Sequence, residues 1–180
     1  MKKIIITSIS LFFLTAVAFA QKSVEVGGAP MYPTKNIIEN AVNSKDHTTL
    51  VAAVKAAGLV ETLQSAGPFT VFAPTNAAFE KLPSGTVETL LKPENKATLS
   101  SVLTYHVVAG RMSSKDVAKA IKAGNGKAEF KTVQGGTLTA MMSGKDVVLK
   151  DSKGNTSKIT IMDVNQSNGV IHVIDTVVMP

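Results

Sequence analysis

The stretch NGVIHVIDTVVMP, Asn168–Pro180, says most about the fold of this chain. Its first two residues are a turn signal. The run that follows is rich in β-branched residues, which suit a pleated strand. Apolar side chains occupy both alternating sets of positions, so both faces of the strand should be covered. We therefore predict a central strand over 169–179 and place the side chain of His172 in the interior, where it either packs or performs chemistry.

Strand patterns also precede this segment at the spacing of a meander. They cover residues 128–133, 137–142, 146–150 and 156–162. Glycine-containing turn signals separate them, as in consecutive hairpins. Between 34 and 124 the periodicity is instead helical, apart from a short apolar strand at 69–73. Helices in the first half and strands in the second half predict an α+β fold.

Helix boundaries are predicted from capping residues. Thr34, Asp46, the turn Pro74-Thr75-Asn76 and either Ser113 or Ser114 are expected at helix N-termini, and Gly58 and Gly124 are expected at C-termini. His47 follows Asp46 in a polar helix start, so we expect its side chain to be solvated.

Residues 1–20 have the features of a cleavable secretory signal peptide. Lys2 and Lys3 precede an apolar run over 4–18, and Ala18-Phe19-Ala20 has the small-x-small pattern of a cleavage site. A membrane anchor is the alternative, but the run is short and has no stop-transfer flank. We therefore expect export to the periplasm or the medium. Residues 21–33 are expected to form an extended arm or linker, and 34–180 a single domain.

Composition limits the chemistry of the exported chain. It contains no cysteine, which excludes thiol nucleophiles, cysteine metal sites and disulfides. The formal charge of +6 falls to +4 once Lys2 and Lys3 are removed. That charge is too small to indicate nucleic acid as a partner. No later segment is apolar and long enough to span a bilayer. We expect the exported protein to be a monomer.

No catalytic or metal-binding pattern is present. A G-x-S-x-G nucleophile turn is absent, and strand alternation turns Asp175 away from His172. Residues 163–167 begin like a calcium loop, but Asn168 and Ile174 stand where glycine and glutamate are required. We interpret 163–167 as an ordinary loop and expect no enzyme activity, metal or cofactor.

Two polar features are candidate binding sites. Lys115, Lys119 and Lys122 share one helical face, which is either simply solvated or contacts an acidic polysaccharide or another anionic surface. Tyr105-His106 follows an apolar helical face. It is either a buried pair with internal hydrogen-bond partners or a dipeptide presented for recognition.

Three motifs together resemble the fasciclin domain family. They are GPFTVFAPTNAAF at 67–79, LTYHVV at 103–108 and NGVIHVID at 168–175. The motif residues that we expect to be structural are Thr70, Phe72, Pro74, Thr75, Asn76, Phe79, Asn168, Gly169 and His172. The resemblance covers residues 34–180 and implies a wedge of two β-sheets with helices packed along one side. Within that domain, His172 is expected to belong to the core.

The resemblance also implies a function. It suggests a secreted, non-enzymatic adhesion or matrix module whose partners are cell-surface or matrix proteins or polysaccharides. Tyr105 and His106 fall on the segment that animal members present to receptors, and Asp163 and Val164 fall on their acidic-aliphatic pair. The alternative is a carrier of a small hydrophobic ligand such as a carotenoid or lipid. Met141, Met142, Met162 and Met179 motivate that alternative, because methionine adapts to irregular ligands.

Overall fold

The computed structural model describes residues 22–180, and the predicted signal peptide lies outside this part of the chain. The strands are β1 (Val24–Val26), β2 (Ala29–Met31), β3 (Phe69–Pro74), β4 (Val107–Ala109), β5 (Lys127–Lys131), β6 (Thr137–Ser143), β7 (Asp146–Lys150), β8 (Thr156–Gln166) and β9 (Gly169–Ile174). The helices are α1 (Ile37–Ala41), α2 (Thr48–Ala57), α3 (Val60–Gln64), α4 (Asn76–Glu80), α5 (Thr86–Leu90), α6 (Lys96–Tyr105) and α7 (Ser114–Ala123), with 3-10 turns at Lys45–His47 and Pro93–Asn95. The predicted α+β class and the four meander strands are confirmed.

The main sheet has the strand order β4-β3-β9-β8-β7-β6-β5. β3 and β9 are parallel, and the other neighbouring strands are antiparallel. β8 changes register between Ile161 and Val164, and Asp163 has a positive φ of 58° there. The strand therefore bends and belongs to both leaves of the predicted wedge: it pairs with β9 in the leaf that contains β3 and β4, and with β7 in the leaf that contains β5 and β6. The expectation of a loop at 163–167 is wrong for 163–166, because a bulge lets the chain remain in β8.

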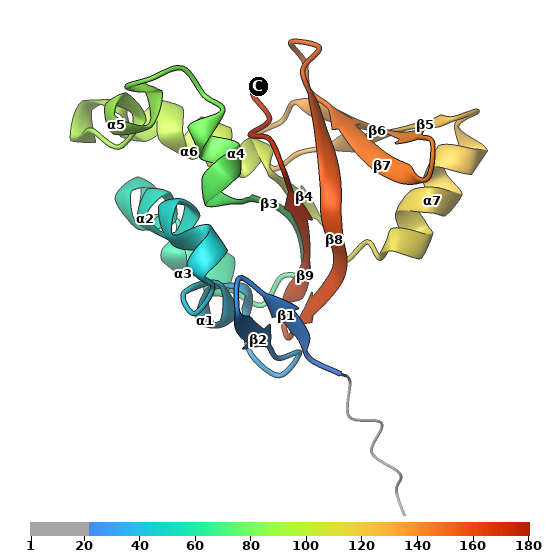
Figure 1. Ribbon diagram of the computed structural model, residues 1–180, viewed down its shortest axis with the longest axis horizontal. Coiled ribbons are helices and arrows are strands. Elements are labelled where there is room, and N and C mark those ends of the chain that lie inside the picture. Colours follow the sequence, from blue (N-terminus) through green and yellow to red (C-terminus); the bar gives the residue numbers. More distant parts are fainter. Residues whose placement is uncertain (1–21) are drawn as a thin grey trace, which may run out of the picture.

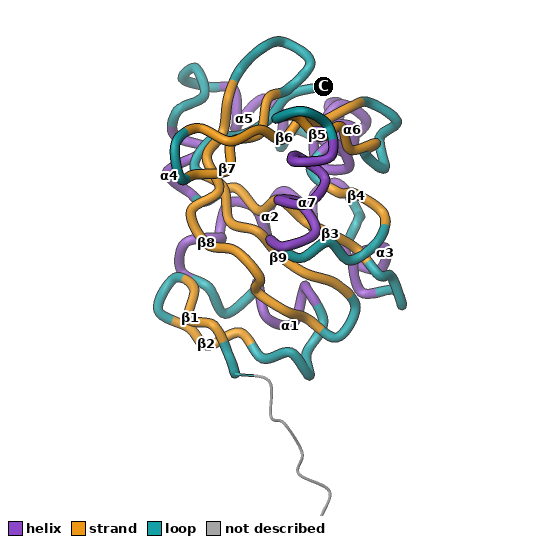
Figure 2. Tube along the Cα trace, turned by 90° about the vertical axis from the view of Figure 1, so that its right-hand side faces the viewer, coloured by secondary structure: helices purple, strands orange, loops and turns teal. Residues whose placement is uncertain are grey.

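The two ends of the sheet approach one another. The N–H of Val133 donates to the carbonyl of Val107 at 2.7 Å, and Val108 forms an isolated bridge with Thr132. The strands thus curl into a nearly closed ring (Figure 2). Helices α1–α6 lie on one side of the β3–β9 leaf, as predicted, whereas α7 lies on the opposite side and packs on β5 and β6 (Figure 1).

The alternating side chains of β3 and β9 serve two separate hydrophobic cores. Val71 and Ile171 enter the first core, which lies against the helices α1–α6. Phe72 and Ile174 enter the second core, which lies inside the ring and is covered by α7. The prediction that β9 is covered on both faces is therefore confirmed.

The last strand is shorter than predicted, since β9 ends at Ile174 instead of 179. The carboxylate of Asp175 accepts a hydrogen bond from the backbone N–H of Lys158 at 2.8 Å, and the hydroxyl of Ser157 accepts one from the N–H of Thr176 at 3.2 Å. The N–H of Asp175 also donates to the carbonyl oxygen of Lys158 at 3.1 Å, so side-chain and backbone bonds together hold the chain just after β9. The chain beyond β9 remains in the interior, because Val177 enters the first core and Val178 the second.

The segment 21–33 is not a simple linker. Its described part forms a hairpin of β1 and β2, and the side chains of Val26 and Met31 are buried in the first core. Gly27 and Gly28 both have positive φ, at 60° and 72°, as a two-residue type I′ hairpin turn requires. The same glycines that suggested a flexible arm are thus the turn of a packed element.

Side-chain caps define several helix starts. Thr75 caps α4 as predicted, and Ser113 caps α7 in a reciprocal capping box with Asp116. The cap of α1 is Asn36 instead of Thr34, because Asn36 forms a capping box with Glu39.

Candidate functional site

Tyr105 lies at the end of α6 and is completely buried. Its hydroxyl donates to the carbonyl oxygen of Thr137 at 2.6 Å and accepts from the N–H of Ser152 at 3.1 Å. Burial raises the pKa of this phenol. Tyr105 therefore ties α6 to β6 and to the turn between β7 and β8.

His106 is equally buried and has both ring nitrogens occupied. Nδ1 lies 2.8 Å from the carbonyl oxygen of Val102, and Nε2 accepts from the N–H of Val178 at 3.2 Å. The proton of the neutral ring therefore belongs on Nδ1, and burial lowers the pKa of His106 to about 4. Of the two interpretations of Tyr105-His106, the structure matches the buried pair. Neither side chain is displayed on the surface.

Asp163 and Val164 occupy the bulge of β8. Val164 is fully buried in the first core. The half-buried carboxylate of Asp163 accepts hydrogen bonds from the N–H of Ser114 at 2.7 Å and from the hydroxyl of Ser114. A negative charge at this helix N-terminus is favourable because the first N–H groups of a helix carry partial positive charge. Asp163 therefore fixes the start of α7.

His172 supports the same segment from the second core, where its ring stacks on Phe72 with centroids 5.8 Å apart. Nε2 lies 2.9 Å from the carbonyl oxygen of Met112, and Nδ1 accepts from the N–H of Asp163 at 3.3 Å. Burial lowers the pKa of His172, so the ring is neutral near pH 7. The side chain of His172 is only 1% exposed.

Thr70 completes this set of contacts. Its hydroxyl donates to the carbonyl oxygen of Gly110 at 2.7 Å and accepts from the N–H of Met112 at 2.9 Å. We call Thr70, Asp163 and His172 the α7 clamp, because together they hold residues 110–114. The clamp joins β3, β8 and β9 to the start of the one helix that lies apart from the others (Figure 1).

The other first-motif residues shape the end of β3. Phe72 fills the second core and Phe79 the first, Pro74 ends the strand, and Thr75 caps α4. The side-chain oxygen of Asn76 accepts from the N–H of Thr49 at 3.0 Å, which joins α4 to α2. These residues have structural roles.

Asn168 and Gly169 have comparable roles at the start of β9. The side-chain oxygen of Asn168 accepts from the N–H of Ile37 at 3.0 Å, and its amide nitrogen donates to the carbonyls of Leu63 and Ser65, each at 2.8 Å. A Cβ atom on Gly169 would collide with the backbone oxygen of Phe69. Asn168 thus satisfies the ends of two helices, and Gly169 allows β3 and β9 to pair.

His47 does not lie where the sequence suggested. It is only 1% exposed, because a 3-10 turn over Lys45–His47 precedes α2 and rotates the ring inward. Nδ1 lies 2.9 Å from the hydroxyl of Ser44. The spacing of His47, Leu50 and Val54 at i, i+3 and i+7 is the signal that would have placed His47 on the buried face.

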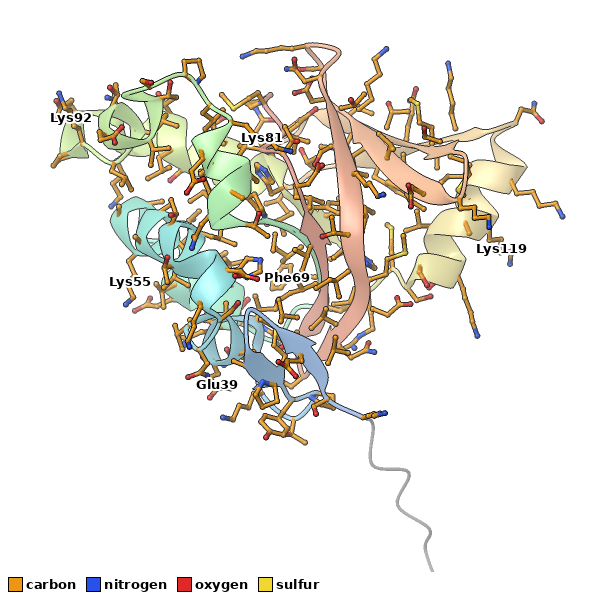
Figure 3. All side chains as sticks on the ribbon, in the orientation of Figure 1. Glu39, Lys55, Phe69, Lys81, Lys92 and Lys119 are labelled. Carbon is orange, nitrogen blue, oxygen red and sulfur yellow. The ribbon has the colours of Figure 1, made fainter. Side chains whose placement is uncertain are left out.

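The predicted lysine face is fully exposed. Lys115, Lys119 and Lys122 project from α7, and Lys127 and Lys131 are exposed on the face of β5 turned away from the second core, with Glu129 between them. In the described part of the chain the ion pairs are Lys81–Asp175 and Lys158–Asp146, so none of these five lysines forms one, although Lys119 interacts electrostatically with Asp116 on the same helix. We call the five residues the lysine face. Figure 3 shows Lys119 on the opposite side of the molecule from Lys55 and Lys92.

The charge of the domain is unevenly divided. Residues 22–106 contain seven lysines and seven acidic residues, whereas 107–180 contain ten basic and six acidic residues. Two of these six acids are engaged in hydrogen bonds to the backbone. Asp163 accepts from the N–H of Ser114 at the start of α7, and Asp151 is buried and accepts from the N–H groups of Lys153 and Asn155. The excess positive charge therefore belongs to the half of the molecule that carries α7.

Within residues 22–180, no group of three or more histidine, aspartate or glutamate side chains is arranged to hold a metal ion. The same residues contain no helix that is both long and apolar enough to cross a bilayer.

A sequence model of the fasciclin domain matches residues 45–180. This chain belongs to the fasciclin domain family. The fasciclin match begins inside the first 3-10 turn, and the residues before it add β1, β2 and α1 to the first core.

Relatives of this fasciclin chain occur in several bacteria. It is 46% identical over 162 residues to Protein sll1483 of Synechocystis, a match that covers 89% of this chain and 82% of the relative. It is 37% identical over 145 residues to the immunogenic protein MPB70 of Mycobacterium bovis, covering 78% and 66% of the two chains. The cell surface glycolipoprotein MPB83 of the same species is also 37% identical, over 78% of this chain and 58% of its own length.

The fold is also found in a solved structure. A FAS1 domain pair from the insect cell adhesion molecule fasciclin I matches with a TM-score of 0.71 at 18% identity, covering 81% of this chain and 51% of that one. At that level of identity the likeness establishes the shared fold alone.

Proposed function

We propose that this protein is an exported, non-enzymatic interaction module that contacts anionic polymers of a cell surface or matrix, such as acidic polysaccharides, through the lysine face. The observation that carries the proposal is the set of five exposed lysines on α7 and β5, none of which forms an ion pair within residues 22–180. A group of like charges raises the local concentration of an oppositely charged polymer, and salt screens the effect over about 10 Å at 0.1 M.

The four residues that resemble adhesion sites in animal members then act indirectly. Tyr105, His106 and Val164 are buried, and the Asp163 carboxylate bonds to Ser114. Their role in this proposal is to set the position of α7 and the strands around it. The surface lysines make the contact.

Relatives support a surface role. MPB83 is named a cell surface glycolipoprotein, and fasciclin I is named a cell adhesion molecule. The absence of catalysis is part of the proposal and has a physical basis in two of the three histidines. Both ring nitrogens of His106 and of His172 are engaged within the fold, so neither ring is available to a substrate.

The carotenoid or lipid carrier is the weaker alternative. Met141, Met162 and Met179 are partly buried and Met142 is 46% exposed, and none of the four lines the cavity of the first core. The methionines that motivated a carrier thus do not gather around an internal space. We therefore do not propose a carotenoid or lipid site built from these four methionines.

The test is binding of the purified protein to an acidic polysaccharide, measured by calorimetry at two salt concentrations. Replacing Lys115, Lys119 and Lys122 with glutamine should weaken binding by about tenfold or more, because each near-surface charge contributes on the order of 0.5–1 kcal/mol. The matched control replaces the exposed lysines Lys55, Lys92 and Lys96 on the helical side, which changes the net charge equally. Equal losses in both variants, or salt-independent binding, would contradict the proposal.

A further inference from the structure

The first core contains a cavity of about 60 Å³. It lies between β3 and the helices α1, α2, α3 and α6, and apolar side chains form nearly all of its wall. Thr62 and Val133 are exposed residues that also line it, so the cavity reaches the surface beside them. Phe69, which lies between the helices and the sheet in Figure 3, belongs to the same wall.

His47 provides a polar group in this wall. Its Nδ1 is occupied by the hydroxyl of Ser44, but Nε2 is buried and has no hydrogen-bond partner. Among the buried side-chain nitrogen and oxygen atoms of residues 22–180, it is the one without a partner. His106 also lines the cavity, yet both of its nitrogens are bonded inside the fold.

The surroundings of His47 determine the charge of its ring and which ring nitrogen carries the proton. Burial lowers the pKa of His47, and the backbone carbonyl of Ala73 opposes that change without forming an aligned hydrogen bond. The ring is therefore neutral near pH 7. A hydroxyl of Ser44 that donates to Nδ1 leaves the ring proton on Nε2, where an acceptor atom is required.

We propose that the cavity is a binding site for a small, neutral, mostly apolar molecule that presents one oxygen atom to Nε2 of His47, such as a short ketone or alcohol. The oxygen supplies the missing partner of the ring, and the hydrocarbon part fills the apolar space. This site lies on the helical side of the sheet and is independent of the lysine face.

Size and polarity restrict the ligand. A water molecule needs about 10–15 Å³, and an engineered apolar cavity of about 150 Å³ binds benzene, so a cavity of 60 Å³ suits a molecule of a few heavy atoms. A charged ligand is excluded because the apolar wall offers it no counter-ion. An acyl chain that entered with its methyl end first would leave Nε2 without a partner.

The experiment titrates the protein with 2-butanone and follows the ¹⁵N resonances of the histidine rings together with the methyl resonances of Leu50 and Val54. We expect saturable shifts at Nε2 of His47 and at both methyl groups, in the millimolar range, and no shift at His172. Butane, which has a similar shape but no oxygen, should bind about tenfold more weakly.

Two variants separate cavity binding from general solvent effects. Ala41→Leu places a larger side chain at a residue that lines the cavity and should abolish the shifts. The matched control is Ala56→Leu at an exposed position of α2, which should leave them unchanged. If Ala41→Leu does not fold, the comparison of 2-butanone with butane on the unaltered protein still decides the question.

The proposal is overturned if the unaltered protein shows no saturable shift at His47. Equal affinity for butane would overturn the assigned role of Nε2. A long-lived water molecule bonded to Nε2 that 2-butanone fails to displace would show that the cavity holds solvent only.

Discussion

The two cores of the molecule each contain a buried histidine, and the two rings differ in how many of their nitrogen atoms are hydrogen-bonded. In the second core His172 has both nitrogens bonded and stacks on Phe72. In the first core His47 has one nitrogen bonded and stands beside a cavity. The hydrogen bonds of the second core fix the position of α7. The first core instead contains a cavity and an N–H donor, Nε2 of His47, that has no acceptor in the described part of the chain. The same residue type is therefore structural on one side of the sheet and open to a ligand on the other.

Tyr105→Ala should have the largest effect on this arrangement. The substitution removes a buried aromatic ring from the second core and leaves the carbonyl of Thr137 and the N–H of Ser152 without their partner. We expect the free energy of unfolding in urea to fall by about 3–5 kcal/mol. Tyr32→Ala, at an exposed tyrosine, is the control and should change it by about 0.5 kcal/mol or less. A small loss for Tyr105→Ala would show that the second core is not tightly packed.

The buried histidines predict a loss of stability in acid. The pKa of His106 is about 4 in the folded protein, below the ordinary value of 6.5, so the unfolded chain binds more protons between these pH values. The contribution of His106 to stability is complete above pH 6.5 and is lost as the pH falls to about 4. It amounts to about 3 kcal/mol. The lowered pKa values of His47 and His172 act in the same direction.

The check is the free energy of unfolding measured from pH 7 to pH 4. His106→Gln should flatten this pH dependence although it lowers stability at pH 7. An unaltered slope in that variant would mean that His106 is not the group that titrates.

Leucine deletions should distinguish the two cores by a smaller amount. Leu138 is fully buried in the second core, whereas Leu50 lines the cavity of the first. A side chain next to an existing void has fewer atoms to lose contact with. We expect Leu138→Ala to lower the free energy of unfolding by about 3–5 kcal/mol and Leu50→Ala by about 2–3 kcal/mol. A larger loss of stability for Leu50→Ala than for Leu138→Ala would contradict the proposal that the first core is less tightly packed than the second.

Asp163→Asn should have the smallest effect on stability, about 1 kcal/mol, because it weakens the charge-assisted bonds at the start of α7. Hydrogen exchange should become faster in α7 and remain unchanged in α2. Asp146→Asn is the control, since it removes the same charge from an exposed ion pair. Faster exchange in α7 of the control would show that charge alone, without the clamp, explains the effect.

Much of the architecture could be predicted from local patterns. The strands at 128–150 follow from alternation and turn glycines, and Thr75 and Ser113 follow from capping chemistry. The errors arose where contacts between distant residues decide. The carboxylate of Asp175 ends β9 early by bonding to Lys158, and a bulge keeps Asp163 inside β8. Neither contact can be recognised from the sequence around the residues that form it.

The candidate site was less accessible from sequence. The first and last residues of the α7 clamp, Thr70 and His172, are 102 positions apart in the sequence. The pairing of β3 with β9 brings these two together, and the pairing of β8 with β9 adds Asp163. Tyr105-His106 has the same sequence whether it faces solvent or the core, because an amphipathic dipeptide fits both environments. Burial by β6 and by the chain after β9 decides between them.

The class of the fold, the family and the apolar character of the last strand could all be predicted from the amino-acid sequence, because they depend on periodicity and on motifs that are contiguous in the chain. The tertiary structure alone decided which polar residues are free. The hydrogen-bond partners of Tyr105, His106, Asp163 and His172 come from segments far away in sequence, and they leave these side chains inside the fold. The lysines of α7 and Nε2 of His47 remain available because no such segment within residues 22–180 bonds to them.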